Sequence, residues 1–163
     1  MPEFILEGRD HAARAESDFV LGFIEAAFFT SNEPSREMED WFTDEAREAR
    51  ENGQECDIPG DAGYNELHPI ALGRIREFCG NWQKKNRKLL ARAYKRAGYD
   101  ETDAGRDLWY TMNGHGVGFW DRDELKARGL GDALTDAAGN HEAHLFFGGH
   151  VEFGDAPFIH IHL

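Results

Sequence analysis

The apolar residues of this chain change their spacing after the segment "YDETDAG", and this change limits the folds that the chain can adopt. Before that point they recur at intervals of three, four and seven, which is the period of an α-helix. After it, the segments Leu108–Trp120 and Ala143–Phe153 alternate as β-strands do, around glycine-based turn signals. The order predicts an α+β fold, in which helices pack on one face of a small antiparallel sheet made of these two hairpins. The alternating C-terminal residues "FIHIHL" fit a further edge strand.

Three helical segments precede the predicted strands. The first, "SDFVLGFIEAAFFTSNEP", can be capped by Ser17 and is apolar on nearly every side, so we expect it to lie centrally. A second, acidic helix is predicted from about Ser35 to Asn52. The third begins at Pro69, carries one apolar stripe and ends near Gly98. A fourth, broken helix is predicted between the hairpins, in "DELKARGLGDALTDAAGN".

The 163 residues suit one domain with a substantial core, and we expect a single globular domain over 1–163. Within it, 1–16 would form an N-terminal arm and 154–163 a C-terminal tail or edge strand. No basic segment followed by an apolar core opens the chain, and no apolar run is long enough to span a bilayer. A cytoplasmic protein without a membrane partner is therefore predicted. Cys56 and Cys79 lack a metal-binding spacing and are expected to be buried small hydrophobes.

The net charge of −13 is distributed unevenly along the chain. From Glu33 to Asp57, ten acidic residues stand against three arginines, a net charge of −7. From Arg74 to Arg96, nine basic residues stand against Glu77 alone, a net charge of +8. The overall charge disfavours general attraction to nucleic acids and acidic membranes, and the basic segment is a local exception.

The basic segment Arg74–Arg96 combines cations with aromatic residues, and such a combination can follow a phosphate backbone. The candidate nucleic-acid contacts are Lys84, Lys85, Arg87, Lys88 and Arg92. The alternative, which the sequence favours, is a solvated helix face that forms ion pairs with the acidic segment. The acidic segment can in turn imitate the phosphates of DNA and occupy a nucleic-acid-binding protein, although most acidic runs are simply solvated.

The segment "DLWYTMNGHGVGFWDR", Asp107–Arg122, combines glycines, aromatic residues and one histidine. It lacks the spacing of a phosphate-binding or dinucleotide-binding loop. His115 could act as a general acid or base oriented by Asp121, but no serine or cysteine nucleophile accompanies them. A structural role is favoured, in which Trp109 packs against Trp120 across the strands, and Asp121 caps the next helix or pairs with Arg122. As a binding surface, the segment would use Trp109, Asn113, His115, Trp120, Asp121 and Arg122.

Histidines accumulate toward the C-terminus. His160 and His162 share one face of the predicted last strand, and His150 could lie on the neighbouring strand. Three imidazoles with an open coordination position are a known zinc arrangement, which makes zinc the candidate cofactor. The same spacing also arises by chance on exposed strands, and "HEAH" is not the H-E-x-x-H of zinc proteases. The favoured prediction is therefore no cofactor, with zinc at these three histidines as the alternative.

The stretch "AGRDLWYTMNGHGVGFWDR" resembles a family of small, uncharacterised proteins that is widespread in bacteriophages, prophages and plasmids. Their shared motif is D-[FL]-W-x-T-x-N-G-H-G-x-G-F-W-D-R. The resemblance extends from about Ser17 to Phe153, while the basic surface of the long helix and the histidine-rich tail depart from the family pattern. It implies a mobile-element accessory protein in the host cytoplasm, without implying a particular activity.

Three functional interpretations follow from these features. The leading one is a non-enzymatic phage accessory protein that binds a host or defence protein, with the acidic surface acting as a DNA mimic. The second is a nucleic-acid-binding protein that uses the basic helix Arg74–Arg96. The third is a metal-binding protein or an enzyme built on the C-terminal histidines or on His115. The sequence leaves the oligomeric state open.

Overall fold

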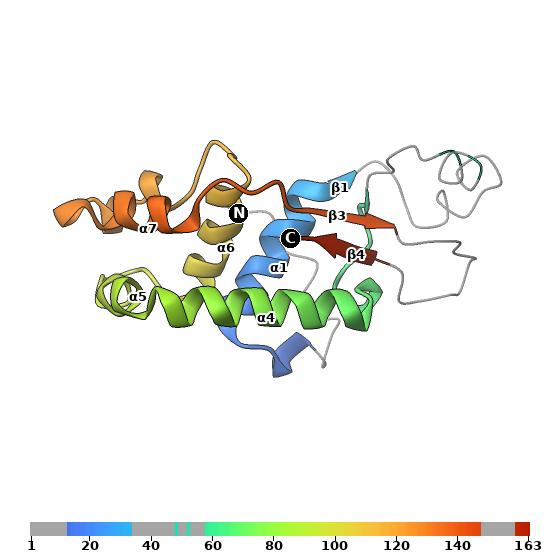
Figure 1. Ribbon diagram of the computed structural model, residues 1–163, viewed down its shortest axis with the longest axis horizontal. Helices are drawn as coiled ribbons and strands as arrows, with labels where there is room; N and C mark the ends of the chain where they lie inside the picture. Colours follow the sequence, from blue (N-terminus) through green and yellow to red (C-terminus); the bar gives the residue numbers. More distant parts are fainter. Residues whose placement is uncertain (1–12, 34–47, 49–51, 53–57, 148–158) are drawn as a thin grey trace.

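The computed structural model describes residues 13–33, 48, 52, 58–147 and 159–163. Helix α1 lies in the middle of the molecule against α6, with α4 along one side and the strands β3 and β4 at the end away from α5 and α7 (Figure 1). The α+β class predicted from the sequence is confirmed. The elements are α1 (Asp18–Ser31), β1 (Asn32–Glu33), β2 (Ile58–Pro59), α4 (Pro69–Lys85), α5 (Arg87–Ala93), α6 (Glu101–Met112), α7 (Leu130–Ala138), β3 (His144–Phe147) and β4 (Ile159–His162).

Helix α1 forms where the sequence predicts it and is central. The Ser17 hydroxyl accepts a hydrogen bond from the backbone N–H of Val20 at 3.3 Å, which caps the first turn. Phe19, Phe23 and Ile24 are fully buried. Because α1 is apolar on most of its surface, it can be covered on several sides at once.

The predicted long helix is present but divided at Asn86. It begins as α4, where the His68 imidazole accepts a hydrogen bond from the N–H of Ile70 and Pro69 occupies the first turn. At Asn86 the backbone leaves helical geometry (φ −105°, ψ 16°), and the side-chain amide donates to the carbonyl of Trp82 at 3.0 Å. The second part, α5, ends at Ala93, before the predicted end near Gly98. The carbonyl of Trp82 thus accepts from both the backbone N–H and the side-chain amide of Asn86 at the junction.

The predicted hairpin Leu108–Trp120 is wrong, because its first half is helical. Helix α6 is capped by Asp100, whose carboxylate accepts from the N–H of Asp103 at 3.0 Å, while the carboxylate of Asp103 accepts from the N–H of Asp100 at 3.2 Å. Nearly every residue in the second half of α6 is buried, so the apolar residues show no single helical stripe. An all-round apolar segment cannot be told from a strand by its period. Gly114, with φ at +66°, ends the helix in the left-handed region instead of forming a hairpin turn.

The antiparallel sheet consists of β3 and β4. The partners across it are His144 with His162, Leu145 with Ile161, Phe146 with His160 and Phe147 with Ile159. The C-terminal strand predicted from "FIHIHL" is confirmed, and it is the described partner of β3. The remainder of the predicted hairpin Ala143–Phe153, after Phe147, lies outside the described residues. The carbonyl of Ile159 also accepts from the N–H of His68 at 2.8 Å, which joins the sheet to the start of α4.

Two glycines allow α1 and α6 to approach backbone to backbone. A Cβ atom placed on Gly22 would lie 2.1 Å from the carbonyl oxygen of Thr102 on α6. A Cβ atom placed on Gly105 would lie 2.0 Å from the carbonyl oxygen of Phe19 on α1. Both distances are far below van der Waals contact, so a side chain at either position would force the helices apart.

Stacked aromatic rings fill the space between α4, α1 and the segment after α6. Trp82 stacks on Phe119 with centroids 5.7 Å apart and on Phe19 at 5.9 Å. Cys79 is free and buried, as predicted, and burial raises the pKa of its thiol; Cys56 lies outside the described residues. Within the part of the chain that the structure describes, no helix is long and apolar enough to cross a membrane.

The predicted fourth helix is present as α7. Short 3-10 turns at Asp123–Leu125 and Ala127–Gly129 precede it, which agrees with a broken helix. Leu130 and Leu134 are buried, and Gly139 ends the helix at a φ of +69°.

Candidate functional site

The two ends of the segment Asp107–Arg122 form an ion pair whose carboxylate is buried. Asp107 is fully buried, and the Nε of Arg122 donates to its two carboxylate oxygens at 2.8 and 3.0 Å. The hydroxyl of Tyr99 donates to the same carboxylate at 2.9 Å. Burial raises the pKa of Asp107, and the hydrogen bonds from Arg122 oppose this shift. Arg122 therefore pairs with Asp107, and the predicted pair with Asp121 is wrong.

Trp109 and Asn113 connect α6 to other elements. The Trp109 Nε1 donates to the hydroxyl of Thr30 on α1 at 2.9 Å, and its ring meets Phe23 edge-on with centroids 5.2 Å apart. The Asn113 amide donates to the carbonyl of Trp109 at 3.0 Å and accepts from the N–H of Ala143 at 2.8 Å. Asn113 thus fixes the end of α6 to the segment that leads into β3.

Thr111 and Gly118 shape the loop after α6. The Thr111 hydroxyl accepts from the N–H of Phe119 at 3.1 Å. A Cβ atom on Gly118, whose φ is +156°, would lie 2.3 Å from that hydroxyl oxygen. These contacts place Phe119 in the aromatic stack of the core, so this half of the segment has a structural role.

Three side chains of the same segment remain outside these contacts. Val117 and Trp120 are 39% and 47% exposed, and Asp121 is exposed as well. The predicted packing of Trp120 against Trp109 is wrong, since no strands form here and Trp109 is buried in the core. Arg122, not Asp121, occupies the position before the next 3-10 turn, so Asp121 does not cap it.

His115 does not have the surroundings of a catalytic base. Its ring meets the edge of Tyr110 with centroids 5.9 Å apart, and burial lowers its pKa. Among the described residues, no hydrogen bond joins its imidazole to Asp121 or to a nucleophile. His115 and Asp121 therefore remain weak catalytic candidates.

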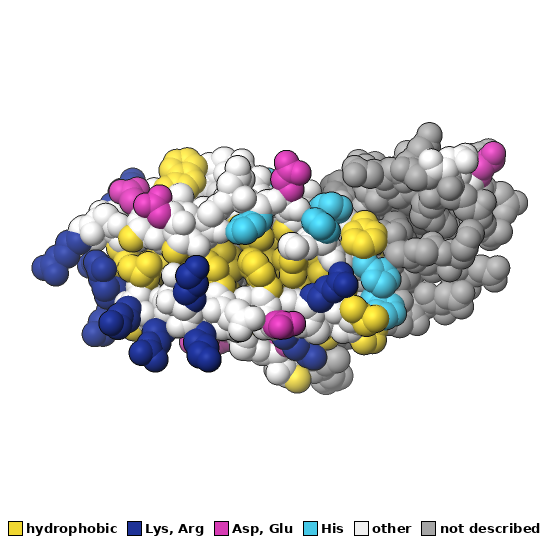
Figure 2. Space-filling view, in the orientation of Figure 1, with side chains coloured by type: hydrophobic (Ala, Val, Ile, Leu, Met, Phe, Trp, Pro, Cys, Tyr) yellow, Lys and Arg dark blue, Asp and Glu magenta, His cyan; other side chains and the backbone are white. Residues whose placement is uncertain are grey.

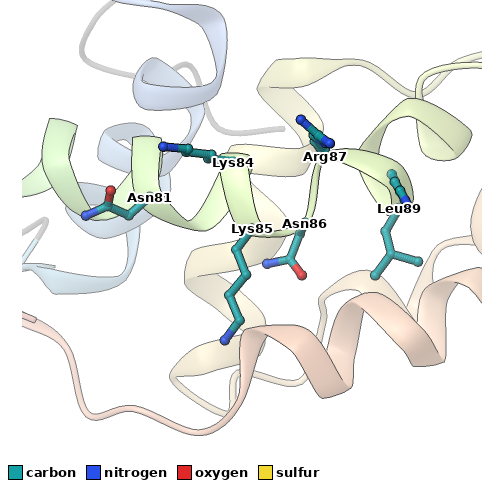
Figure 3. A pocket seen from close by; sticks show the side chains of 7 residues that line it. Asn81, Lys84, Lys85, Asn86, Arg87 and Leu89 are labelled. Carbon is teal, nitrogen blue, oxygen red and sulfur yellow. The ribbon is translucent and has the colours of Figure 1, made fainter.

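The predicted nucleic-acid contacts form one basic surface at the junction of α4 and α5. All five side chains are exposed, and Figure 2 shows Lys and Arg gathered over this end of the molecule. A pocket of about 650 Å³ lies at the junction. In Figure 3, Lys84 and Arg87 lie on one side of the helix axis, and Lys85 extends on the other. The basic surface consists of Lys84, Lys85, Arg87, Lys88 and Arg92, and the pocket is lined by Asn81, Lys84, Lys85, Asn86, Arg87, Lys88 and Leu89.

The cations of the basic surface have no acidic partner among the described residues, whereas some other arginines do. Arg76 pairs with Glu16, and Arg106 pairs with Glu25 at 2.8 Å. The ion pairs that the sequence predicts between the basic and acidic segments involve residues 34–47, 49–51 and 53–57, which lie outside the described ranges. Within those ranges, the basic surface is a concentration of uncompensated positive charge.

Sequence reasoning identified the lysines and arginines but not Asn81 and Asn86, which also line the pocket. An asparagine inside a helical pattern is a signal for a helix interruption, because its side chain competes with the backbone for hydrogen bonds. Asn86 is the residue at which the helix is interrupted, so this signal was present in the sequence.

The exposed face of the β3–β4 sheet carries imidazole rings. His160 stacks on His68 with centroids 4.6 Å apart, and Phe146 lies on its other side at 5.7 Å. His162 faces His144 across the sheet, a contact that the sequence did not suggest because the strand register was unknown. Figure 2 shows histidine side chains gathered over this end.

A three-histidine zinc site is not visible in the described part of the chain. There, no group of three or more His, Cys, Asp or Glu side chains is placed to hold a metal ion. His150 lies outside the described residues, so zinc at His150, His160 and His162 stays a prediction.

Comparison with known proteins identifies no relative of this chain. No family model matches the chain, and no curated protein or solved structure is significantly similar to it. The resemblance to phage, prophage and plasmid proteins therefore remains an expectation from the motif.

Proposed function

We propose that the protein binds the phosphate backbone of a nucleic acid through the basic surface. The observation that carries the proposal is the pocket at the α4–α5 junction, which is lined by four exposed cations without an acidic partner among the described residues. Like charges held this close repel one another, and a polyanion that lies across them removes the repulsion and releases counterions.

The arrangement of the basic surface supports contact with the phosphate backbone of a nucleic acid and not recognition of its bases. The cations lie on both sides of the helix junction (Figure 3), and both Lys and Arg contribute. A lysine ammonium contacts phosphate as a point charge, without the fixed geometry that selects a base. The net charge of −13 repels nucleic acid at long range, so binding should be strong only at low salt.

Fluorescence anisotropy with a short labelled oligonucleotide, single-stranded or duplex, tests the proposal. The variant Lys84→Glu/Lys88→Glu should lose binding at low salt. The control Lys126→Glu/Arg128→Glu changes the net charge equally at exposed positions outside the pocket and should keep most of the affinity. The salt dependence should also become shallower only in the first variant.

Two results would reject the nucleic-acid proposal. One is absence of binding by the unmodified protein at low salt. The other is equal loss in both double variants, since that would reflect net charge alone and not the basic surface.

A second candidate function is binding of a host or defence protein, as expected of a mobile-element accessory protein. The exposure of Val117 and Trp120, in a segment whose neighbouring residues are tied into the core, favours it.

Pull-down from host lysate with and without nuclease, using the unmodified chain and Trp120→Ala, tests this function. A partner that survives nuclease and is lost with Trp120→Ala supports it; a partner lost with nuclease supports the nucleic-acid proposal instead. The hypothesis that the protein imitates DNA rests on the acidic segment, which lies mostly outside the described residues.

A further inference from the structure

The two histidines at the end of the β3–β4 sheet form a cross-strand pair. His144 and His162 are direct partners in the antiparallel register, and both side chains are exposed. Their neighbours Leu145 and Ile161 point into the core, which fixes the side of the sheet on which the imidazoles stand. The pair is therefore held by the backbone of two strands.

The separation of the two rings suits shared coordination of an ion. Their centroids lie 5.4 Å apart, and the planes are tilted by 31°. Two imidazoles on a tetrahedral Zn²⁺, with Zn–N bonds of about 2.1 Å, place their centroids about 5 Å apart. Rotation of the exposed rings can therefore direct one nitrogen of each at the same ion with little movement of the backbone.

The neighbouring histidine pair does not offer this geometry. His68 and His160 stack with centroids 4.6 Å apart and planes at 20°. The nitrogen lone pairs lie in the ring planes, so in stacked rings they run side by side and do not converge. The Nδ1 of His68 is also occupied by the N–H of Ile70.

We infer that His144 and His162 bind one late first-row divalent transition-metal ion, such as Zn²⁺, with water in the remaining positions. Imidazole nitrogen suits these ions and does not suit Mg²⁺, which prefers oxygen ligands. The inference is independent of the nucleic-acid proposal, since the basic surface and the sheet lie toward opposite ends of the molecule (Figure 1).

Thermal unfolding with and without Zn²⁺ tests the inference, because a metal that joins two strands binds the folded state and raises its melting temperature. The unmodified protein should show a rise with Zn²⁺ and none with Mg²⁺. The rise should disappear in His144→Gln and in His162→Gln and persist in the matched controls His141→Gln and His68→Gln. Melting without metal shows that each variant folds.

Specific outcomes would overturn the site. It is wrong if Zn²⁺ gives no rise in the unmodified protein or an undiminished rise in His144→Gln. Loss of the rise in His160→Gln and His162→Gln, but not in His144→Gln, would also overturn it and would favour zinc at His150, His160 and His162.

Discussion

At the scale of single residues, two tryptophans of the same segment lie in opposite environments. Trp109 is 1% exposed and Trp120 is 47% exposed. Truncating Trp109 to Ala removes a large buried side chain and should lower the free energy of unfolding by about 3–5 kcal/mol. Trp120→Ala should change it by about 0.5 kcal/mol or less. Denaturant unfolding of both variants measures the contrast, and equal losses would contradict the structure.

Glu16 gives a prediction about pH. Its carboxylate accepts hydrogen bonds from the Nε of Arg76 at 3.0 Å and from the hydroxyl of Tyr64 at 2.6 Å. The hydrogen bond from Arg76 is the main cause that lowers the pKa of Glu16 below its ordinary 4.5. Burial, together with the hydrogen bond to Glu16, raises the pKa of Tyr64 to about 12. The folded state therefore binds the Glu16 proton more weakly than the unfolded state does.

The contribution of Glu16 to stability is therefore complete above the pKa that Glu16 has in the unfolded state. It is lost as the pH falls through the pKa that Glu16 has in the folded state. Glu16→Gln should be less stable than the unmodified protein at pH 7. The difference should shrink as the pH falls below the ordinary pKa of 4.5. Urea unfolding over this pH range checks the prediction, and a difference that grows with acidity would have the wrong sign.

At the scale of elements, the contact between α1 and α6 depends on Gly22 and Gly105. Gly22→Ala or Gly105→Ala puts a methyl group into the backbone of the facing helix and should destabilise the fold by about 3 kcal/mol or more. Gly80 lies on α4 with no atom near its missing Cβ, so Gly80→Ala should be neutral or stabilise by up to about 1 kcal/mol. Thermal melts of the three variants measure the difference, and a neutral Gly105→Ala would show that the helices lie farther apart.

The elements that the sequence predicted are those with a local signal. Ser17 marks the start of α1, and Pro69 marks the start of α4. The second half of α6 was wrongly predicted to be a strand. It is buried on several sides, so its residues are apolar on several sides and show no helical period in the sequence. Asn113-Gly114 was similarly ambiguous, since a glycine with positive φ both closes hairpins and ends helices.

At the scale of the whole molecule, charge is separated along the chain, with a basic segment and an acidic segment. The lysines and arginines of the candidate site could be predicted, because a net charge of +8 over 74–96 is visible in the composition. The pocket that these side chains line could not be predicted, because it depends on the interruption of the helix at Asn86. The pair of His144 and His162 could not be predicted either, because it depends on the register of two strands that are distant in sequence.

The separated charge predicts an effect of polyanions on stability. Tripolyphosphate carries closely spaced negative charges and should raise the melting temperature by binding the folded basic surface. The rise should be lost in Lys84→Glu/Lys88→Glu and kept in Lys126→Glu/Arg128→Glu. Sodium chloride at the same ionic strength is the control for screening, and an equal rise in both variants would show that the basic surface is not involved.

The pairing of α1 with α6 also has a kinetic consequence. The Trp109–Thr30 and Arg106–Glu25 hydrogen bonds join residues 79 and 81 positions apart. Helical proteins fold rapidly when their contacts are local, and closing a loop of this length costs entropy before any contact stabilises it. We therefore expect the encounter of α1 with α6, and not the formation of the individual helices, to set the rate at which this chain folds. Stopped-flow refolding slower than is usual for helical domains of this size would agree with that order of events.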